Sequence, residues 1–569
     1  MWIFSCILAF LLFVFMLFQV SVKMGFLMSL LLCSSLSFGS PVNYPISLAG
    51  NFGEPRPNHF HGGIDIRTGQ VEGKAIFSVA DGYVSRITVG IGGFGNAVYV
   101  RHPGGITTVY CHLKKFVPQL AAIVRKWQYQ NQTCFADVRL RPTDYPVAKG
   151  QFIAVSGNTG ASKAPHLHLE FHSTKTWDFL DPLDYLKDYV TDTTKPIAHS
   201  FMVYPIEGEG VFCGSTRKQS YGFSSPELVR KFTAWGKVGF GIWANDYMEG
   251  SYGILGVHKT TLTVDGKTVF QSIVDSIPDH CNRMVNSWGD YEHYCRTHVW
   301  YMKSFAEPGN TLPFMHCGTA DRGVFTFNKE RDYRFVYTVT DIFGNSRQYA
   351  FTVKGQRQHI PDAPKRSVMN VLYYDRMNNF QRPGLMLLVA PGMLADDLIL
   401  SPKIKVKPGS LSDVWSFSYK SSPLLGWAKI ALRLNTKVKK TDKLYIVSHY
   451  GADRYMGGVY RNGWVTGRIR ELGASYEIAY DDEPPVLTVS DVYSGRLRAV
   501  AYDKKSGLQS LKGFIDGRFV LFEYVEKAGV YVCNLNEALV QKTGDEHKLK
   551  LVAMDNRNNQ RILESTFRY

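Results

Sequence analysis

Two short histidine motifs that lie far apart in the chain place the strongest constraint on its fold. Residues 58–66 contain His61-x-x-x-Asp65, and residues 157–168 end in His166-x-His168. Two imidazoles and one carboxylate form a ligand set that suits zinc, and three protein ligands leave a fourth position for water, as in catalytic rather than structural zinc sites. We therefore expect a fold in which these two distant segments meet.

The second motif reads as a strand. Side chains two residues apart point to the same face of a strand, so His166 and His168 would both face one cleft. The residues between and after them, Leu167, Leu169 and Phe171, would then point into apolar packing. The spacing alone does not decide whether His166 or His168 binds the metal.

The first motif requires a bend. His61 and Asp65 would share a helix face, but Gly62-Gly63 argues against a helix. In a straight strand the two side chains would stand about 13 Å apart, too far to share one ion. The glycine pair is therefore interpreted as a bend that brings both onto one metal. For a lone histidine, an ordinary place in a turn is the better interpretation; the combination of motifs favours a site.

Several further motifs occur in a fixed order between residues 50 and 172, and they carry a family resemblance. They are His61-Gly-Gly-Ile-Asp65, Val79-Ala-Asp-Gly-Tyr-Val84, Gly93-Phe-Gly-Asn96, Tyr110-Cys-His-Leu113, Val147-Ala-Lys-Gly-Gln151, Ser156-Gly-Asn-Thr-Gly160 and Pro165-His-Leu-His168. This region resembles the lysostaphin/LytM-type zinc peptidases of peptidoglycan, peptidase family M23. The resemblance implies an antiparallel two-sheet β fold with one zinc ion held by His61, Asp65 and His168. It also implies that His112 and His166 are catalytic histidines that do not bind the metal.

The resemblance further implies a function. Zinc would lower the pKa of its bound water to about 7 and make it the nucleophile. His112 or His166 would take a proton and later deliver one to the leaving amine. The expected substrate is the peptide cross-link of peptidoglycan. A catalytically silent activator of a wall amidase, or an envelope binding protein that acts through its β modules on partner proteins, are the alternatives.

Two features depart from the family pattern. Some relatives carry a tyrosine shortly before the first zinc histidine, but the run from Phe52 to Phe60 contains none. The segment between His112 and Val147 is also long, and its apolar spacing predicts a helix from Phe116 to Gln130. This insertion either shapes substrate access or covers the sheet edge passively. His59 is assigned to the surroundings of the site or to the surface, and His102 and His172 to structural roles.

The N-terminal 39 residues predict export. Residues 3–20 are almost wholly apolar, and a second apolar run, 26–32, follows Lys23 and precedes a tail of small residues. This pattern is typical of a secretory signal cleaved near Gly39 or Ser40, with Met24 as an alternative start. The first run is long enough for a marginal membrane span, so membrane attachment is a second interpretation. The expected location is the periplasm or the cell envelope.

The chain after residue 190 is too long for one domain and reads as β throughout. We expect a mainly β protein: a peptidase domain over 40–190, an immunoglobulin-like (Ig-like) β domain over 191–355, a β domain of unclear type over 356–480 and an Ig-like β domain over 481–569. An internal repeat supports the two Ig-like units. It aligns 192–197 with 481–486, 244–246 with 501–503, and Asp341-x-x-x-Asn345 with Asp555-x-x-x-Asn559.

Charge and cysteine content add weaker constraints. The net charge of +16 without a basic helix or an aromatic-basic motif argues against nucleic acid and fits an anionic envelope polymer. A loose Cys/His cluster over residues 280–317 has no C-x-x-C pair, so a disulfide or simple burial is expected there rather than a second zinc site.

Overall fold

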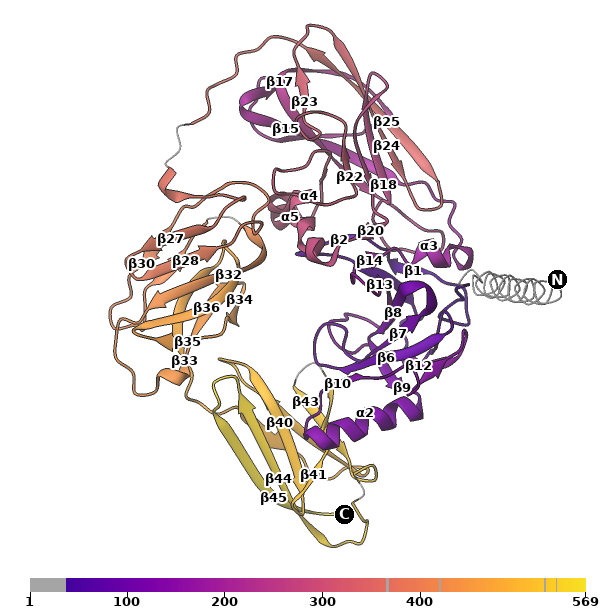
Figure 1. Ribbon diagram of the computed structural model, residues 1–569, viewed down its shortest axis with the longest axis vertical. Helices are drawn as coiled ribbons and strands as arrows, with labels where there is room; N and C mark the ends of the chain where they lie inside the picture. Colours follow the sequence, from indigo (N-terminus) through magenta and orange to yellow (C-terminus); the bar gives the residue numbers. More distant parts are fainter. Residues whose placement is uncertain (1–36, 365–367, 419–420, 527–528, 539) are drawn as a thin grey trace, which may run out of the picture.

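The computed structural model describes residues 37–569 apart from 365–367, 419–420, 527–528 and 539. Nearly all of the predicted export signal, residues 1–36, lies outside the described residues. Within the described part, no helix combines the length and apolar character that a membrane span requires. The expectation of a mainly β protein is confirmed: strands build four successive bodies, each around its own apolar core (Figure 1).

The first domain contains two antiparallel sheets that pack around one core. The larger sheet runs in the order β1 (Leu48–Gly50), β4 (Gly63–Arg67), β13 (His166–Ser173), β8 (Ile106–Cys111), β7 (Ala97–His102), β6 (Gly82–Val89) and β10 (Ala136–Arg139), with β11 (Pro146–Val147) beside β6 and β14 (Phe179–Leu180) beside β13. The smaller sheet comprises β5 (Ala75–Phe77), β12 (Phe152–Ser156) and β9 (Leu113–Phe116). A hairpin of β2 (Pro55–Arg56) and β3 (His59–Phe60), helix α2 (Pro118–Asn131) and the short helix α3 (Leu183–Leu186) complete the domain.

The second domain folds one continuous sheet around a core rich in phenylalanine. Phe201 stacks on Phe351 with ring centroids 4.0 Å apart, although their strands are not hydrogen-bonded neighbours, so the sheet closes over itself. Its strands are β15 (Ile197–Phe212), β16 (Gln219–Gly222), β17 (Glu227–Asn245), β18 (Lys259–Val264), β19 (Lys267–Ile273), β21 (Met302–Lys303), β22 (Met315–Cys317), β23 (Phe325–Phe327), β24 (Asp332–Thr340) and β25 (Ser346–Gly355). A helical segment links β19 to β21 and contains a 3-10 turn over Asp279–Met284, α4 (Val285–Trp288) and α5 (Tyr291–Thr297).

The last two domains each pair two antiparallel sheets. In the third domain, one sheet has the order β27 (Asn378–Arg382), β28 (Leu385–Val389), β32 (Pro423–Arg433), β36 (Trp464–Glu471) and β35 (Val459–Arg461). The other sheet has the order β30 (Lys403–Lys405), β31 (Val414–Ser416), β37 (Ser475–Tyr480), β33 (Leu444–Tyr450) and β34 (Ala452–Tyr455). The strands β26 (Val371–Leu372) and β29 (Leu398–Ile399) form a separate pair. In the fourth domain, one sheet has the order β38 (Val486–Val489), β39 (Arg496–Tyr502), β43 (Val530–Asn534) and β42 (Glu523–Glu526). The other sheet has the order β41 (Arg518–Val520), β40 (Leu508–Ile515), β44 (Glu546–Asp555) and β45 (Gln560–Arg568).

The first and second domains share a sheet and an apolar cluster. Strand β20 (Ser276–Ile277) of the second domain pairs antiparallel with β14, so the main sheet of the first domain continues into its neighbour. Phe52, Phe60 and Phe179 from the first domain pack in one cluster with residues of the second domain, among them Cys281. The two domains are therefore joined by backbone pairing as well as by side-chain burial.

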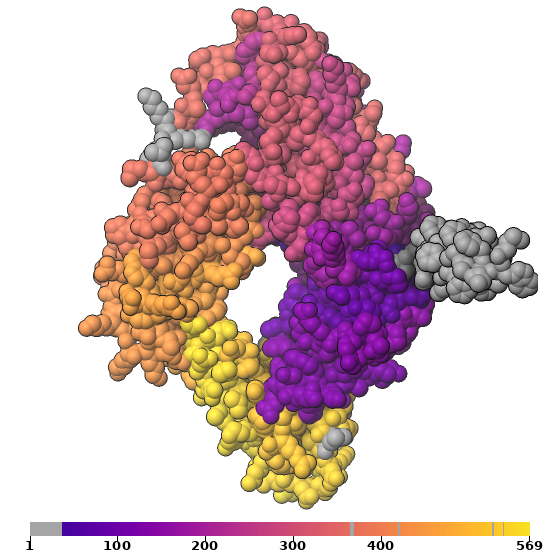
Figure 2. All heavy atoms as spheres, in the orientation of Figure 1, coloured from indigo at the N-terminus to yellow at the C-terminus, as the bar shows by residue number. Residues whose placement is uncertain are grey.

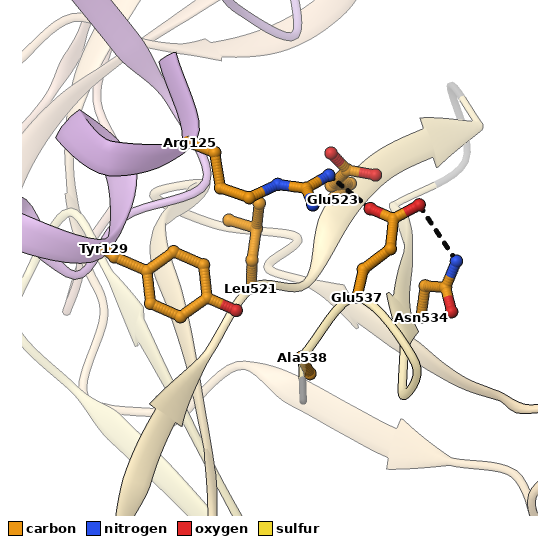
Figure 3. Close-up of a pocket in the computed structure, with 7 residues that line it drawn as sticks. All are labelled: Arg125, Tyr129, Leu521, Glu523, Asn534, Glu537 and Ala538. Carbon is orange, nitrogen blue, oxygen red and sulfur yellow. Dashed lines mark hydrogen bonds and ion pairs between the residues drawn. The ribbon is translucent and has the colours of Figure 1, made fainter. Parts of the chain in front are cut away.

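Helix α2 closes the four domains into a ring (Figure 1). Its buried side chains include Leu120 and Val124, which pack on the core of the first domain. Tyr129, farther along the helix, meets Phe519 of the fourth domain edge to face, with ring centroids 5.5 Å apart. Figure 3 shows this junction, where Arg125 forms an ion pair with Glu537. Figure 2 shows an opening through the middle of the molecule, bounded by all four domains.

The cysteines are not paired in the described part of the chain. Cys281 is buried, Cys295 is exposed and Cys317 is half-buried, and all three are free thiols. Of the two alternatives expected for this region, the structure shows no disulfide among the described residues, and it shows burial for Cys281 alone of these three cysteines. Within the described residues, the histidines near these cysteines form no metal-ligating group of three.

Candidate metal centre

Two neighbouring strands bring the predicted ligands together. Strand β13 pairs antiparallel with β4 so that His168 lies opposite Asp65. On its other side β13 pairs with β8, where His168 lies opposite Cys111, and His112 follows directly. His61 stands just before β4. Register in one sheet therefore places residues that are far apart in the sequence around one point.

Gly62 and Gly63 allow neighbouring parts of the chain to approach closely. A Cβ on Gly63 would lie 2.1 Å from the carbonyl oxygen of Leu169, and a Cβ on Gly62 would lie 2.6 Å from the ring of Phe179. Neither glycine has a positive φ. The predicted convergence of His61 and Asp65 occurs, but the glycines are needed because β4 lies tightly against β13 and β14, not because of an unusual backbone conformation.

Three ligand atoms converge within hydrogen-bond distance. His61 Nε2 lies 3.0 Å from Asp65 Oδ1 and 3.0 Å from His168 Nδ1, and His168 Nδ1 lies 2.8 Å from Asp65 Oδ1. Ligands of a tetrahedral zinc ion with bonds of about 2.0 Å are separated by about 3.3 Å, so a slight widening would admit the ion. All three side chains are buried. The donor set and its spacing fit zinc.

The outer hydrogen bonds fix which nitrogen faces the centre. His61 Nδ1 donates to the carbonyl oxygen of Asn51 at 2.6 Å, which leaves Nε2 free as a ligand. His168 Nε2 donates to Glu170 Oε1 at 2.9 Å, which leaves Nδ1 free. Such outer contacts orient metal-binding imidazoles and raise their basicity.

The electrostatics of the centre favour a cation. Burial lowers the pKa of His61 to about 4, against the attraction of Asp65. Burial also opposes the charged form of His168, but hydrogen bonds with Asp65 and Glu170 outweigh it and raise its pKa to about 9. Burial would raise the pKa of Asp65, yet His61 and the hydrogen bonds from the histidines hold it well below its usual range. The cluster thus holds a positive charge, either a proton or a metal ion.

A chain of hydrogen bonds extends from His168 along β13. Glu170 Oε2 accepts from His172 Nε2 at 2.8 Å, and His172 Nδ1 donates to the carbonyl oxygen of Trp177 at 3.1 Å. Sequence reasoning assigned His172 a structural role and did not single out Glu170. The strand alternation that places His166 and His168 on one face also places Glu170 and His172 there, so this signal was present in the sequence.

Asp65 has a second partner on its outer oxygen. Arg56 Nη2 lies 2.7 Å from Asp65 Oδ2 and 3.6 Å from Glu54 Oε2. Burial raises the pKa of Glu54 to about 7, although Arg56 opposes this shift. No motif distinguished Arg56 in the sequence, because the β2–β3 hairpin that carries it reaches Asp65 only in the fold.

The two predicted catalytic histidines flank the centre. His112 and His166 have ring centroids 4.8 Å apart, and His112 lies 5.8 Å from His168. His112 Nδ1 donates to the carbonyl oxygen of Thr159 at 2.8 Å, and His166 Nδ1 donates to that of Ala164 at 2.8 Å. His112 therefore keeps Nε2 as an acceptor, whereas His166 Nε2 lies 3.4 Å from Asp65 Oδ1. Burial, and then the charges of His168 and His166, lower the pKa of His112 to about 3, so it is neutral near pH 7.

The remaining histidines of this domain lie outside the ligand set. His59 is exposed and its Nδ1 contacts the carbonyl oxygen of Pro57 at 3.1 Å. His102 is buried between the carbonyl oxygen of Asp81 at 2.8 Å and Thr108 Oγ1 at 2.7 Å. His102 thus has a structural place.

Comparison with known proteins identifies the class of the first domain. Residues 59–128 match the model of Peptidase family M23, and residues 369–481 match that of a Zu5-like domain. The chain therefore contains an M23 peptidase domain.

Two curated relatives share this region. One is an uncharacterized metalloprotease of Haemophilus influenzae, 37% identical over 112 residues, or 20% of this chain and 18% of the relative. The other is the DD-carboxypeptidase/endopeptidase Mpg of Neisseria meningitidis, 34% identical over 110 residues, or 19% of each chain. The matched segment thus spans about a fifth of either relative.

Solved structures are also similar to the chain. The catalytic domain of lysostaphin from Staphylococcus simulans is 23% identical and covers 25% of this chain and 92% of its own, with a TM-score of 0.19. A zinc-containing peptidase from Vibrio cholerae is 23% identical and covers 24% of this chain and 38% of its own, with a TM-score of 0.18.

Proposed function

We propose that this chain is a zinc-dependent endopeptidase that hydrolyses peptide cross-links of peptidoglycan. The observation that carries the proposal is the convergence of His61 Nε2, His168 Nδ1 and Asp65 Oδ1 within 3.0 Å of one another. The outer hydrogen bonds of both histidines leave these nitrogens free for a metal. Zinc bound there would act as a Lewis acid and would lower the pKa of water at its open position.

The side chains around the ligands would handle protons. His112 and His166 each donate Nδ1–H to a backbone carbonyl. This leaves the Nε2 of His112 as an acceptor, and the Nε2 of His166 lies 3.4 Å from Asp65 Oδ1. Because the pKa of His112 is lowered to about 3, its imidazole is neutral at the pH of the envelope. Either histidine can accept a proton from the attacking water and return it to the leaving amine, and the other can donate a hydrogen bond to the oxyanion only when its Nε2 is protonated.

The family and the chemistry of the chain support a wall substrate. The Neisseria relative bears the name DD-carboxypeptidase/endopeptidase, which describes cleavage of peptide bonds. The predicted export signal would place the enzyme with peptidoglycan outside the cytoplasm. The net charge of +16 favours attraction to an anionic envelope polymer. A silent activator of a wall amidase is disfavoured, because such a protein has no need for three ligands and two flanking histidines.

Digestion of purified sacculi by the full chain tests the proposal. Mass spectrometry should find soluble fragments cut at peptide bridges. His168→Ala should lose both bound zinc, measured by elemental analysis, and fragment release. His112→Ala should keep the metal while its rate falls by about 10²- to 10⁴-fold, the usual contribution of one acid–base group.

His316→Ala, which removes an exposed histidine of β22, is the matched control and should behave as wild type. Identical fragments from all four proteins would refute the assignment. Cleavage without bound metal would refute the zinc dependence.

A further inference from the structure

Two clusters of aspartates lie outside the candidate metal centre. Asp192, Asp246 and Asp341 form the first cluster, in the second domain, and Asp481, Asp503 and Asp555 form the second cluster, in the fourth domain. In each cluster one carboxylate oxygen per residue lies within 4.8 Å of the other two. Five of the six side chains are buried and Asp503 is half-buried. Among the residues that the structure describes, no lysine or arginine forms an ion pair with any of the six.

The first cluster contains a carboxylate oxygen without a partner. Asp246 is only 4% exposed, and its Oδ1 accepts no hydrogen bond in the structure. Its neighbours in the cluster are the carboxylates of Asp192 and Asp341, which have no proton to donate when ionised. A buried charge of this kind is strongly unfavourable unless it is paired or binds a metal. A bound cation would therefore stabilise these three carboxylates.

The same arrangement recurs in the second cluster. Asn345 Nδ2 donates to the carbonyl oxygen of Asp192 at 3.1 Å and to Asp341 Oδ2 at 2.7 Å. At the equivalent place, Asn559 Nδ2 donates to the carbonyl oxygen of Asp481 at 2.9 Å and to Asp555 Oδ2 at 2.8 Å. Two domains thus hold an aspartate from the linker and one from the last hairpin in the same contacts with an asparagine. The third aspartate of each cluster directly follows a strand, β17 or β39.

We propose that each aspartate cluster binds one calcium ion. An all-oxygen, carboxylate-rich ligand set suits a hard cation, whereas zinc prefers the nitrogen and sulfur donors that are missing from the two clusters. Calcium accepts six to eight oxygens in flexible geometry, so backbone carbonyls and water can complete a site that has three carboxylates. Magnesium demands a stricter octahedron and retains most of its water.

The positions of the clusters indicate what the ions would do. Asp192 lies in the linker between the first and second domains, and Asp481 lies between β37 of the third domain and β38 of the fourth. Ile342 and Phe343, next to Asp341, pack against the core of the first domain. Arg557, two residues after Asp555, donates to the carbonyl oxygens of Leu444 and Gly458 in the third domain. An ion in each cluster would therefore fix a junction between two domains.

Calcium titration of the full, zinc-loaded chain, freed of other divalent ions, tests the proposal. Isothermal titration up to about 10 mM calcium, above the weak affinities of extracellular calcium sites, should show two bound ions per chain. Asp246→Asn should bind one, Asp503→Asn should bind one, and the double variant should bind none. Asp375→Asn, an exposed aspartate that pairs with Arg376, should still bind two.

Thermal unfolding separates loss of binding from loss of folding. Without calcium, Asp246→Asn should unfold at or above the wild-type temperature, because the substitution relieves repulsion among buried carboxylates. Calcium should raise the midpoint of the wild type and of Asp375→Asn but not that of the double variant. Calcium stabilisation that the double variant retains, no uptake by the wild type, or tighter binding of magnesium than of calcium would each overturn the proposal.

Discussion

The candidate zinc centre and the two aspartate clusters differ in ligand atoms and in where the fold places them. The zinc centre takes two imidazole nitrogens and one carboxylate, with His168 and Asp65 opposite each other on paired strands. The aspartate clusters take carboxylates alone, from linkers, strand ends and a hairpin turn. Regular strands supply the fixed geometry that a reaction needs, whereas irregular segments at domain junctions need a cation to hold them. On the two proposals, one chain would separate a catalytic metal from structural ones by secondary structure.

Selective chelation should produce the largest contrast. Phenanthroline, which prefers zinc, should reduce fragment release from sacculi to background, and added zinc should restore it. EGTA half-saturated with zinc chelates calcium while it buffers free zinc, so it should lower the unfolding midpoint and leave the zinc centre occupied. Equal loss of activity with both reagents, at a temperature where the protein stays folded, would show that the two kinds of site do not have separate roles.

The affinity for zinc should depend steeply on pH. A proton on His168, whose pKa is about 9, occupies the nitrogen that binds the metal, so affinity is lost as the pH falls below 9. Competition by one proton predicts about a tenfold loss per pH unit, or about a thousandfold between pH 9 and pH 6. Zinc competition with a fluorescent chelator at several pH values measures this slope. A flat profile would contradict the proposed role of His168 as a ligand.

Glu170→Gln should weaken zinc binding and spare calcium binding. The substitution removes the negatively charged carboxylate that accepts the hydrogen bond from His168 Nε2 at 2.9 Å. Loss of such an outer partner lowers the affinity for the metal by about 10- to 100-fold. The matched control is Glu330→Gln, at an exposed position of the second domain. Unchanged zinc affinity in Glu170→Gln would show that the hydrogen-bond chain along β13 does not support the metal.

Gly63→Ala should separate β4 from β13. Its Cβ would lie 2.1 Å from a backbone oxygen, and overpacking of this kind costs about 1–3 kcal/mol of the free energy of unfolding. Zinc uptake should fall as Asp65 moves, with the calcium stoichiometry unchanged. Gly222→Ala, in strand β16, is the control, because its Cβ would meet nothing closer than 3.9 Å. Equal stability of the two variants would exclude the close approach as the reason for glycine.

Tyr129→Ala should have the smallest effect and act only on ring closure. The substitution removes the edge-to-face contact with Phe519, and an aromatic pair of this kind contributes about 0.5–1.5 kcal/mol. Hydrogen exchange at the junction of α2 with the fourth domain should increase, with zinc and calcium binding unchanged. Tyr252→Ala, at a fully exposed tyrosine, is the control. Altered zinc binding in Tyr129→Ala would link ring closure to the candidate metal centre.

The sequence predicted what local spacing determines. Alternation in one strand indicated that His166 and His168 share a face, and the apolar spacing after Phe116 predicted α2. The same alternation could have identified Glu170. The repeat aligned Asp192 with Asp481 but could not show that three carboxylates meet, because the directions of loop side chains depend on tertiary packing.

Contacts between domains were not predictable from the sequence. Arg56 reaches Asp65 from a hairpin whose Phe60 N–H donates to Asn282 of the second domain at 2.8 Å. Strand β20 joins the sheet of the first domain through only two residues, too short a segment to carry a recognisable pattern. Helix α2 was expected to shape access or to cover a sheet edge, whereas its contact with the fourth domain depends on how all four bodies are arranged.

The double hydrogen bond between Asn51 and Gly256 has a practical consequence for dissecting this protein. Asn51 Nδ2 donates to the Gly256 carbonyl oxygen and the Gly256 N–H donates to Asn51 Oδ1, each at 2.7 Å. The backbone carbonyl oxygen of the same asparagine accepts the hydrogen bond from His61 Nδ1. A fragment cut at residue 190 would lack this brace and strand β20. The smallest piece suited to enzymology therefore extends through β25 to Gly355, beyond the limit that family motifs suggest.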